Sequence, residues 1–486
     1  MADIYDTIIV GGGLAGFAVA LLIVETYPSQ KVLLLEKKSR VGGRIKTIRT
    51  RQDEQDIYYD VGAVRVPVYH QRVKQWMKKL GCTPVRIPWE GRPSNAREWE
   101  TYLKWLTIHV NRVELELNSM ETILTKYPPP EPLQWHYENH LRQKNAADFI
   151  AEFKNYTAPT YYTVKGGLET IIDKLRERLE KYPFFVYQTN VEIHQIDYSN
   201  RRFTVSPNRY HARNLFLCCP SESIQSFRGI TESRSFLWNT VTHMNPYLRV
   251  FGKVRDRVRV RDRDRNSGFP REKQWMGDVL NVCIPTQSSS SIYQLSYSDG
   301  NKARYLLTQI LQYKMESILS SEFQKQGHDH LEIEWIDYHY WKHGTHSWIP
   351  GCPSRLYYKE ILQPISPSVP LYVCGESFSH HQGWIEGVFE TVEEAWNRFC
   401  DPDLFVDPTM SLPLIAVEEL RRGHAPWVLF DGYVIDIGSY MDIHPGGKQA
   451  IQAFIGKDIS SVFRRIGHSA LAYSVIRSFI VAKILL

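Results

Sequence analysis

A glycine-rich loop close to the start of the chain limits the fold more than any other feature. An apolar run at 8–10 leads into Gly-Gly-Gly-Leu-Ala-Gly at 11–16, and small apolar residues follow. A buried strand, a tight glycine turn and a helix in this order open a βαβ unit that binds a dinucleotide. A second apolar run at 32–35 ends at Glu36, where such a unit carries an acid. The pattern predicts an α/β, Rossmann-like domain.

The glycines and the acid of this unit have separate predicted roles. Gly11 allows the tight turn, Gly13 lets the backbone approach a pyrophosphate, and Gly16 lets helix and strand pack closely. The helix N-terminus then presents unpaired amides and the positive end of its dipole to the phosphates. Glu36 would bind the ribose hydroxyls, and its charge would disfavour a 2′-phosphate, so NADP is not expected.

The length and charge of the chain indicate a soluble enzyme of several domains. With 486 residues the chain is too long for one ordinary core, and two or three domains are expected. A formal charge of +6 would suggest nucleic-acid binding, but 253–273 alone contains nine basic and four acidic residues. The alternation of Arg and Asp there favours a solvated loop over a docking patch. No nucleic-acid partner is expected.

The cysteines and the apolar runs indicate a cytoplasmic location. Seven cysteines, an odd number without metal-like spacing, fit a reducing compartment. The sequence shows no secretory leader and no uncharged apolar run of about 18 residues, so no membrane span is expected. The apolar end at 478–486 is short and contains Lys483, which favours a last strand or helix.

The residues that follow the glycine loop favour FAD over NAD. Arg-Val-Gly-Gly-Arg at 40–44 and Asp-Val-Gly-Ala-Val-Arg at 60–65 resemble the flavin-containing amine oxidoreductases, the family of monoamine, polyamine and L-amino acid oxidases. In that family the Arg-x-Gly-Gly-Arg element lies along the FAD diphosphate and approaches the isoalloxazine. The resemblance implies an FAD site that includes Arg40, Gly43 and Arg44.

This resemblance extends to about residue 400. The segments at 165–168, 191–196 and 215–220 look like the family's glycine turn, the strand that meets adenine and a strand that ends in proline. The segments at 371–376 and 383–387 are similar to the strand and helix that close the FAD site. The dipole of that helix would stabilise negative charge on the reduced flavin. The further FAD contacts implied are Val191, Gly375, Glu376, Trp384 and Ile385.

Arg65 constrains the substrate. In L-amino acid oxidases an arginine in a Gly-x-x-Arg-x-Pro stretch like that at 62–67 grips the substrate carboxylate, because a guanidinium pairs with both oxygens. Tyr297 looks like the family's second carboxylate contact, and Trp384 and Trp348 would wall the pocket. Two alternatives stay open: Arg65 could pair with a structural acid, and the aromatic residues could belong to the core.

Arg249 departs from the family pattern. Many amine oxidases carry a lysine, linked through water to the reactive flavin nitrogen, on the strand that corresponds to 246–252. This chain has Arg249 there, and Lys253 follows four residues later. Loss of the lysine could leave amine oxidation intact and slow the reaction of reduced flavin with oxygen. A helix-patterned segment at 98–153 lies where the family inserts its substrate cap.

The last part of the chain resembles cytochrome b5 from about residue 412 onward. His444 opens the sequence His-Pro-Gly-Gly, and His468 lies 24 residues later. The resemblance implies a haem b with His444 and His468 as axial ligands and with Tyr440 and Phe463 against the porphyrin. Two axial histidines leave the iron no vacant position, so one-electron transfer is the expected use.

The sequence therefore predicts three parts: an FAD module at 1–400, a linker at 401–413 and an α+β haem domain at 414–486. In the module, FAD segments are expected at about 1–70, 165–225 and 365–400. Substrate or cap segments, with a mixed sheet and helices, are expected at about 71–164 and 226–364.

The combined interpretation is an FAD-dependent oxidoreductase that oxidises the alpha C–N bond of an L-amino acid or amino-acid derivative to an imine. Electrons would pass to the haem, to O2 or to both, and a redox partner would reoxidise the haem; a homodimer is left open. A polyamine or monoamine oxidase, or an amino-acid desaturase, is the alternative within the class. A non-catalytic redox sensor or electron-transfer scaffold is the alternative from another class.

Overall fold

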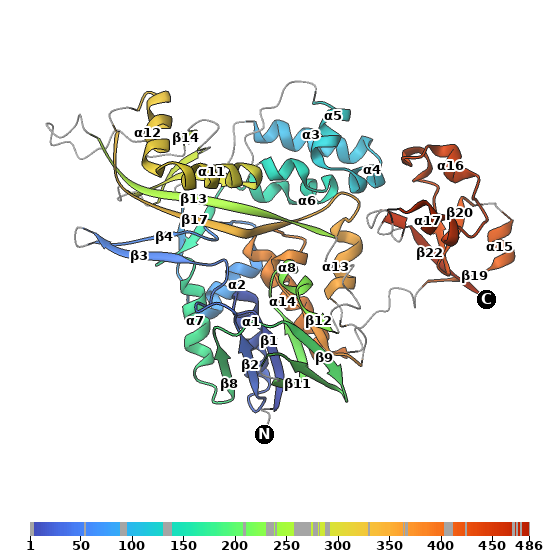
Figure 1. The fold of residues 1–486 in the computed structure, drawn as a ribbon, viewed down its shortest axis with the longest axis horizontal. Helices are drawn as coiled ribbons and strands as arrows, with labels where there is room; N and C mark the ends of the chain where they lie inside the picture. Colours follow the sequence, from blue (N-terminus) through green and yellow to red (C-terminus); the bar gives the residue numbers. More distant parts are fainter. Residues whose placement is uncertain are drawn as a thin grey trace.

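The computed structural model shows a large module, which holds most of the sequence, and a small C-terminal domain (Figure 1). Residues 257–273 of the Arg- and Asp-rich segment and residues 403–411 of the expected linker lie outside the described residues. The structure describes residues 4–52, 55–87, 95–129, 139–207, 210–229, 238, 241–256, 274–275, 280, 282–286, 292–328, 331–362, 364, 368–402, 412–422, 425–468, 472, 475–476 and 479–485.

A sheet built around the first strand carries the glycine loop. Strand β1 (Ile4–Val10) pairs in parallel with β2 (Val32–Leu35) on one side and with β11 (Tyr210–Leu217) on the other. Strand β8 (Phe185–Gln188) follows β2, and β18 (Leu371–Val373) pairs with β11, both in parallel. Segments from distant parts of the chain thus meet in one sheet, which confirms the predicted α/β class. The remaining strands of this sheet are β9 (Gln195–Ser199), β10 (Arg202–Val205) and β12 (Arg228–Gly229).

Helix α1 (Leu14–Thr26) follows the glycine loop and is buried over most of its length. Its side chains are apolar on all sides, which is the pattern of a helix enclosed by other elements. It packs against α7 (Thr170–Leu179) and α14 (Ile385–Cys400). Helix α2 (Gln71–Leu80) packs on α14 as well, and its Trp76 stacks on Phe389 with ring centres 4.9 Å apart. The later FAD-like segments therefore enclose the first one.

A second, antiparallel sheet lies above the first in Figure 1 and contains two long strands. Strand β13 (Thr242–Asp256) pairs with β17 (Leu331–Trp348) and β16 (Ile292–Asp299). This register puts Arg249 opposite Tyr297 on one side. Helices α11 (Gly300–Gln312) and α12 (Met315–Lys325) pack on this sheet, which continues through β15 (Val282–Pro285) and β14 (Gln274–Trp275).

Helices occupy the segment that was expected to form the cap. They enclose a core of their own around Trp99, Leu106 and Phe149. Three of them begin at a polar side chain, from Asn111, Ser119 or Asn145, that accepts a hydrogen bond from the first turn. The helices are α3 (Ala96–His109), α4 (Arg112–Leu117), α5 (Met120–Lys126) and α6 (Ala146–Tyr156).

Asp60 contacts some of the short elements that lie between the sheets and the cap. Its buried carboxylate accepts hydrogen bonds from Thr47 Oγ1 (2.6 Å), Thr163 Oγ1 (3.1 Å) and the amide of Leu168 (2.9 Å). Burial raises the pKa of Asp60 to about 6, although these bonds oppose the rise. The short elements are β3 (Thr47–Gln52), β4 (Gln55–Asp60), β5 (Val66–Pro67), β6 (Pro84–Arg86), β7 (Tyr161–Val164), η1 (Asn139–Gln143), α8 (Ser221–Gln225), α13 (Ser354–Leu362) and η4 (Glu376–Phe378).

The C-terminal domain has the predicted α+β composition. Strands β20 (Trp427–Phe430) and β21 (Tyr433–Asp436) form a hairpin whose two turn residues, Asp431 and Gly432, both have positive φ. Strand β22 (Ile480–Leu485) pairs with β21, so a strand ends the chain as expected. The other elements are β19 (Leu414–Ala416), α15 (Val417–Arg421), η6 (Met441–Ile443), α16 (Lys448–Gln452) and α17 (Ser460–Ile466).

Two further observations concern the cysteines and the membrane. All seven cysteines are free thiols. Within the described ranges, no helix has both the length and the apolar character that crossing a bilayer requires.

Gly16→Ala should strongly destabilise the large module, because a Cβ at residue 16 would lie 2.1 Å from the carbonyl oxygen of Gly11. Gly13→Ala is the matched control, since a Cβ there would have no neighbour closer than 3.9 Å. In urea unfolding we expect a loss of about 1–3 kcal/mol or more for Gly16→Ala, and less than about 1 kcal/mol for the control. Equal stability of the two variants would contradict this close packing of helix and strand.

Candidate functional site

The glycine loop and the backbone at 42–43 form a cradle at the N-terminus of α1. Gly11 has a φ of +112°, and a Cβ there would lie 2.4 Å from the carbonyl oxygen of Cys218. Gly13 forms a β-bridge with Gly42. A Cβ at Gly13 would have its nearest neighbour, the Cα of Gly43, 3.9 Å away. Gly13 is also the N-cap of α1 and makes no side-chain bond to the first amides of the helix. A glycine cradle with uncapped amides fits a diphosphate.

Glu36 lies at the end of β2, as predicted, and contacts the glycine loop. Its carboxylate accepts hydrogen bonds from the amides of Gly12 (2.8 Å) and Lys38 (2.9 Å). An ionised carboxylate accepts about four hydrogen bonds, so capacity remains for the hydroxyls of a ribose. The amide of Val191 donates to the carbonyl of Glu36 at 2.9 Å. The predicted adenine and ribose contacts are therefore neighbours.

Arg40 is engaged by the protein itself. Its guanidinium donates to the carbonyls of Val41 (2.7 Å), Gly43 and Ile45 (3.0 Å), and it pairs with Glu169 at 3.3 Å. These bonds hold the glycine turn of the 40–44 segment. A direct contact of Arg40 with the FAD diphosphate stays a prediction.

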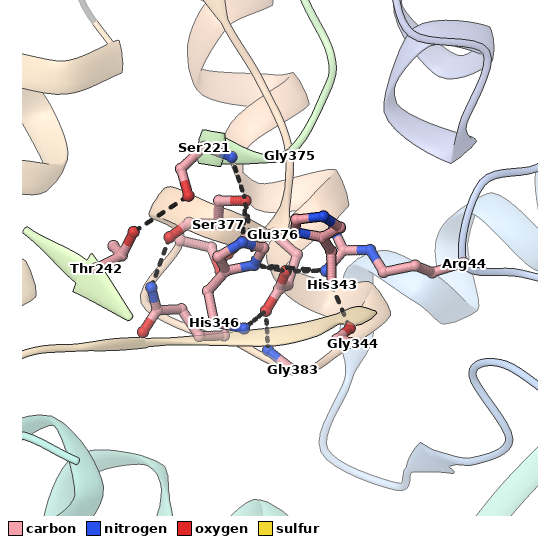
Figure 2. Close-up of polar contacts among 12 residues, drawn as sticks. Arg44, Ser221, Thr242, His343, Gly344, His346, Gly375, Glu376, Ser377 and Gly383 are labelled. Atoms are coloured by element: carbon pink, nitrogen blue, oxygen red, sulfur yellow. Dashed lines mark hydrogen bonds and ion pairs between the residues drawn. The ribbon is translucent and has the colours of Figure 1, made fainter. Parts of the chain in front are cut away.

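A chain of buried charged groups joins the other predicted FAD segments (Figure 2). Nη1 of Arg44 donates to Glu376 at 2.5 Å. The same carboxylate accepts from the amides of His346 (2.9 Å) and Gly383 (2.6 Å). The imidazole of His346 lies between two acids, with Nδ1 2.9 Å from Glu376 and Nε2 3.0 Å from Glu222. Segments from the start and the end of the module thus share one network.

The charges of this network shift the pKa values of its members. Burial alone would raise the pKa of Glu376, but Arg44 and His346 outweigh it and hold this pKa well below its usual range. Burial lowers the pKa of His346, and the carboxylates of Glu376 and Glu222 outweigh that effect and raise it. Burial also raises the pKa of Glu222, but His343 and His346 outweigh this effect and lower that pKa strongly.

The sequence did not single out Glu222. It suggested proton handling for His346 but favoured an ordinary polar role. The signal that identifies them is tertiary. His346 is on β17 and Glu222 on α8, and only the fold brings these elements to Glu376.

The start of α14 lies beside this network. Trp384 is the N-cap of the helix, makes no side-chain bond to its first amides, and is followed by the buried Ile385. Gly375 has a φ of +136°, and its amide donates to Oγ1 of Thr391 at 2.9 Å. The predicted residues Gly375, Glu376, Trp384 and Ile385 therefore lie on one turn and the helix end that it packs against. The uncapped amides suit stabilisation of negative charge.

Arg65 lies over two aromatic rings. Its guanidinium carbon is 5.0 Å from the ring centre of Tyr161 and 5.5 Å from that of Trp384. The predicted carboxylate ligand and the predicted pocket wall therefore meet. Trp348, the other expected wall residue, is fully buried, and its indole donates to the carbonyl of Ser379 at 2.9 Å.

Three polar side chains, of His70, Asn155 and Trp384, lie in this buried region. The ring centre of His70 is 5.3 Å from that of Trp384. Burial lowers the pKa of His70 to about 3, and a hydrogen bond with Asn155 opposes this effect, so the imidazole is neutral. Among the described residues, Nε1 of Trp384 has no hydrogen-bond partner. The sequence missed His70 and Asn155, and their place beside Trp384 makes them candidate substrate contacts.

Arg249 and Tyr297 form a separate pair on the second sheet. The guanidinium carbon of Arg249 is 4.8 Å from the ring centre of Tyr297. The charge of Arg249 lowers the pKa of Asp60, on which burial has the larger and opposite effect. Lys253 pairs with Glu334 at 3.0 Å. The four predicted catalytic residues thus form two pairs, Arg65 with Trp384 and Arg249 with Tyr297.

In the C-terminal domain, His444 and His468 lie close to each other. Burial lowers the pKa of His444, and the charge of His468 lowers it further. Nδ1 of His468 donates to the carbonyl of Phe463 at 2.9 Å, which leaves its Nε2 with a lone pair for a metal. The ring of His468 stacks on Phe463 at 3.9 Å, and the ring of Tyr440 is 5.6 Å from that of His444.

The surroundings of these histidines fit a haem. A Cβ at Gly446 would lie 3.0 Å from the ring of His444, so glycine is needed where the turn meets the imidazole. Partly buried apolar side chains, among them Met441 and Phe454, pack against the core of this domain. Two imidazoles with apolar and aromatic neighbours are the donor set of a b-type haem. In the described parts of the chain, no cluster of three or more His, Cys, Asp or Glu side chains could hold a metal ion.

Comparison with known families identifies two domains. Residues 9–80 match the model of an NAD(P)-binding Rossmann-like domain. Residues 416–485 match the cytochrome b5-like heme/steroid binding domain. The two matched regions contain the glycine loop and the two histidines, respectively.

Several characterised relatives are oxidases. The chain is 36% identical over 37% of its length to an L-amino acid oxidase of Cerastes cerastes, and 32% identical over 21% to amine oxidase [flavin-containing] A of Bos taurus. The aligned segments span only 35% and 18% of those two relatives. An uncharacterized protein of Acanthamoeba polyphaga mimivirus is 22% identical over 80% of this chain and 92% of its own length.

A solved structure shares the fold of the large module. Cyclohexylamine oxidase from Brevibacterium oxydans superimposes with a TM-score of 0.60 and 15% identity, over 82% of this chain and 99% of the oxidase. The resemblances predicted from sequence are confirmed. The chain has L-amino acid oxidase and flavin-containing amine oxidase homologues, the fold of an amine oxidase with a Rossmann-like domain, and a cytochrome b5-like domain at its C-terminal end.

Proposed function

We propose that this protein is an FAD-dependent enzyme that oxidises the alpha C–N bond of an L-amino acid, or of a close derivative, to an imine. The observation that carries the proposal is the position of Arg65, whose guanidinium lies over Trp384 at the start of α14. A carboxylate held by Arg65 would place the alpha carbon of an amino acid beside the helix end that is expected to face the flavin. The oxidase relatives support the same chemistry.

The residues of the chain would bind and orient the reactants. FAD, when bound, supplies the hydride acceptor. The loop at 11–16 would hold its diphosphate and Glu36 its ribose. Arg65 would fix the substrate carboxylate, and the buried surroundings of Trp384 would exclude water from the neutral amine. Hydrolysis of the imine would then give a 2-oxo acid and ammonia without a strong protein base.

We further propose that a haem b held by His444 and His468 receives the electrons one at a time. With two axial histidines the iron has no open position, so electron transfer is its natural use. O2 is retained as a second acceptor, and Arg249 in place of a lysine favours a slow reaction with it. The boundaries at 400 and 414, a redox partner for the haem, a homodimer and a cytoplasmic location stay predictions.

A second candidate is oxidation of an amine that lacks a carboxylate, as in a monoamine or polyamine oxidase. The structural similarity to cyclohexylamine oxidase favours it. In that case Arg65 would be structural, and its contacts with Tyr161 and Trp384 would be its whole role. The amino-acid desaturase and the redox scaffold have no comparable observation in their favour.

Arg65→Ala should lower kcat/KM for amino acids by at least about 100-fold, because two charge-assisted hydrogen bonds to the substrate carboxylate are lost. The kcat/KM of Arg65→Lys should lie between the values of Arg65→Ala and the wild type, since lysine keeps the positive charge but lacks the planar guanidinium that pairs with both oxygens. The effect of both substitutions is measured from the rate at which a panel of L-amino acids and amines bleaches the flavin band without oxygen. Equal losses on amines without a carboxylate would favour the second candidate, and no bleaching by any compound would contradict an enzymatic role.

His468→Ala should abolish haem binding, because the iron loses one axial ligand. The purified variant is expected to lack the Soret band and to keep the rate at which substrate bleaches the flavin. Tyr440→Phe is the matched control, since it keeps the ring beside His444 and should retain the haem. A variant without His468 that still shows a six-coordinate b-type spectrum would rule out this residue as a ligand.

A further inference from the structure

The imidazole of His346 faces a carboxylate at each of its two nitrogens. Nδ1 lies 2.9 Å from Oε2 of Glu376, and Nε2 lies 3.0 Å from Oε2 of Glu222. A neutral imidazole has one N–H and one bare nitrogen, so it can satisfy only one of these acids. The ring is fully buried, whereas the side chain of Glu222 is 23% exposed. Two carboxylates, one at each nitrogen, therefore favour the doubly protonated imidazolium.

The charged groups around His346 balance only while it is protonated. Arg44 and the imidazolium supply two positive charges against Glu376 and Glu222. Nδ1 of His346 also lies 3.2 Å from the hydroxyl of Ser377 and 3.5 Å from Nη1 of Arg44. Nδ1 of His343 is 3.6 Å from Glu222. Loss of the His346 proton would leave one uncompensated negative charge in a largely buried site.

The effect of that charge would reach two segments expected to bind FAD, at 1–70 and 365–400. Glu376 holds Arg44 of the first segment by its Oε2. Its Oε1 accepts from the amide of Gly383, the residue before the N-cap of α14. A weaker hold on Glu376 would loosen both contacts, and the added negative charge would disfavour an anionic cofactor.

We propose that His346 is a positioning residue of the flavin site, and that its buried imidazolium makes the retention of FAD dependent on pH. This inference rests on the proposed binding of FAD. The raised pKa of His346 agrees with it, because two carboxylates outweigh the effect of burial. The imidazolium, and the contacts that need it, are present below that raised pKa and are lost as the pH rises through it.

The test is the dissociation constant of FAD from the full-length protein between pH 6 and pH 10, followed by flavin fluorescence. For the wild type we expect the dissociation constant of FAD to be constant at the acid end of this range. At higher pH it should rise by up to about tenfold per pH unit, which is the slope for one linked proton. His346→Gln should bind more weakly at neutral pH and show no such inflection. His339→Gln is the matched control, because His339 is on the same strand and pairs with Asp337 at 2.8 Å, outside this network.

Glu222→Gln separates this role from a loss of folding. It removes one of the two acids and leaves a hydrogen-bonding group, so a folded variant should still bind FAD and show its inflection at a lower pH than the wild type. A wild-type constant that does not change with pH, or an unchanged inflection in His346→Gln, would overturn the proposal and leave the proposed FAD chemistry intact. A wild type that binds no FAD at any pH would overturn both.

Discussion

The ion pair between Arg44 and Glu376 joins segments 332 residues apart, and the cofactor module depends on it. The side chain of Glu376 is buried and that of Arg44 is 28% exposed, so loss of Arg44 would leave the charge of Glu376 in a medium of low polarity. Glu376 also accepts two amides and the imidazole of His346. A single carboxylate thus fixes the 40–44 turn, the strand β17 and the start of α14 relative to one another.

Polar contacts attach the helical cap, α3 to α6, to the rest of the large module. The carboxylate of Asp148 in α6 accepts from the amide and the hydroxyl of Ser354, and Glu116 in α4 pairs with Arg355 through two bonds of 2.8 Å. The cap keeps an apolar core of its own. Candidate substrate contacts from α6, such as Asn155, therefore belong to a unit with an apolar core separate from the residues that would hold FAD. Selectivity can change in such an arrangement while the cofactor site stays the same.

The C-terminal domain is organised by contacts that are more local in the sequence. Its two histidines are 24 residues apart and are delivered by turns within one small core. Local sequence is enough to specify this arrangement, because the glycines after His444 and the carbonyl of Phe463 orient the rings without help from the large module. The proposed two-electron oxidation in the large module and the proposed one-electron carrier in the small domain are complementary chemistries.

The sequence by itself determined the elements whose chemistry is local. The loop at 11–16 and the position of Glu36 follow from spacing, because close backbone packing restricts which residues can stand there. The pair His444 and His468 follows from the resemblance of the last segment to cytochrome b5. Only the tertiary structure decided the partners of long-range charges. It separated Arg65 and Trp384 from Arg249 and Tyr297, and it put His346 between two acids. A histidine or an arginine in a sequence carries no record of the carboxylate or ring that will face it, because such contacts form between strands and helices hundreds of residues apart.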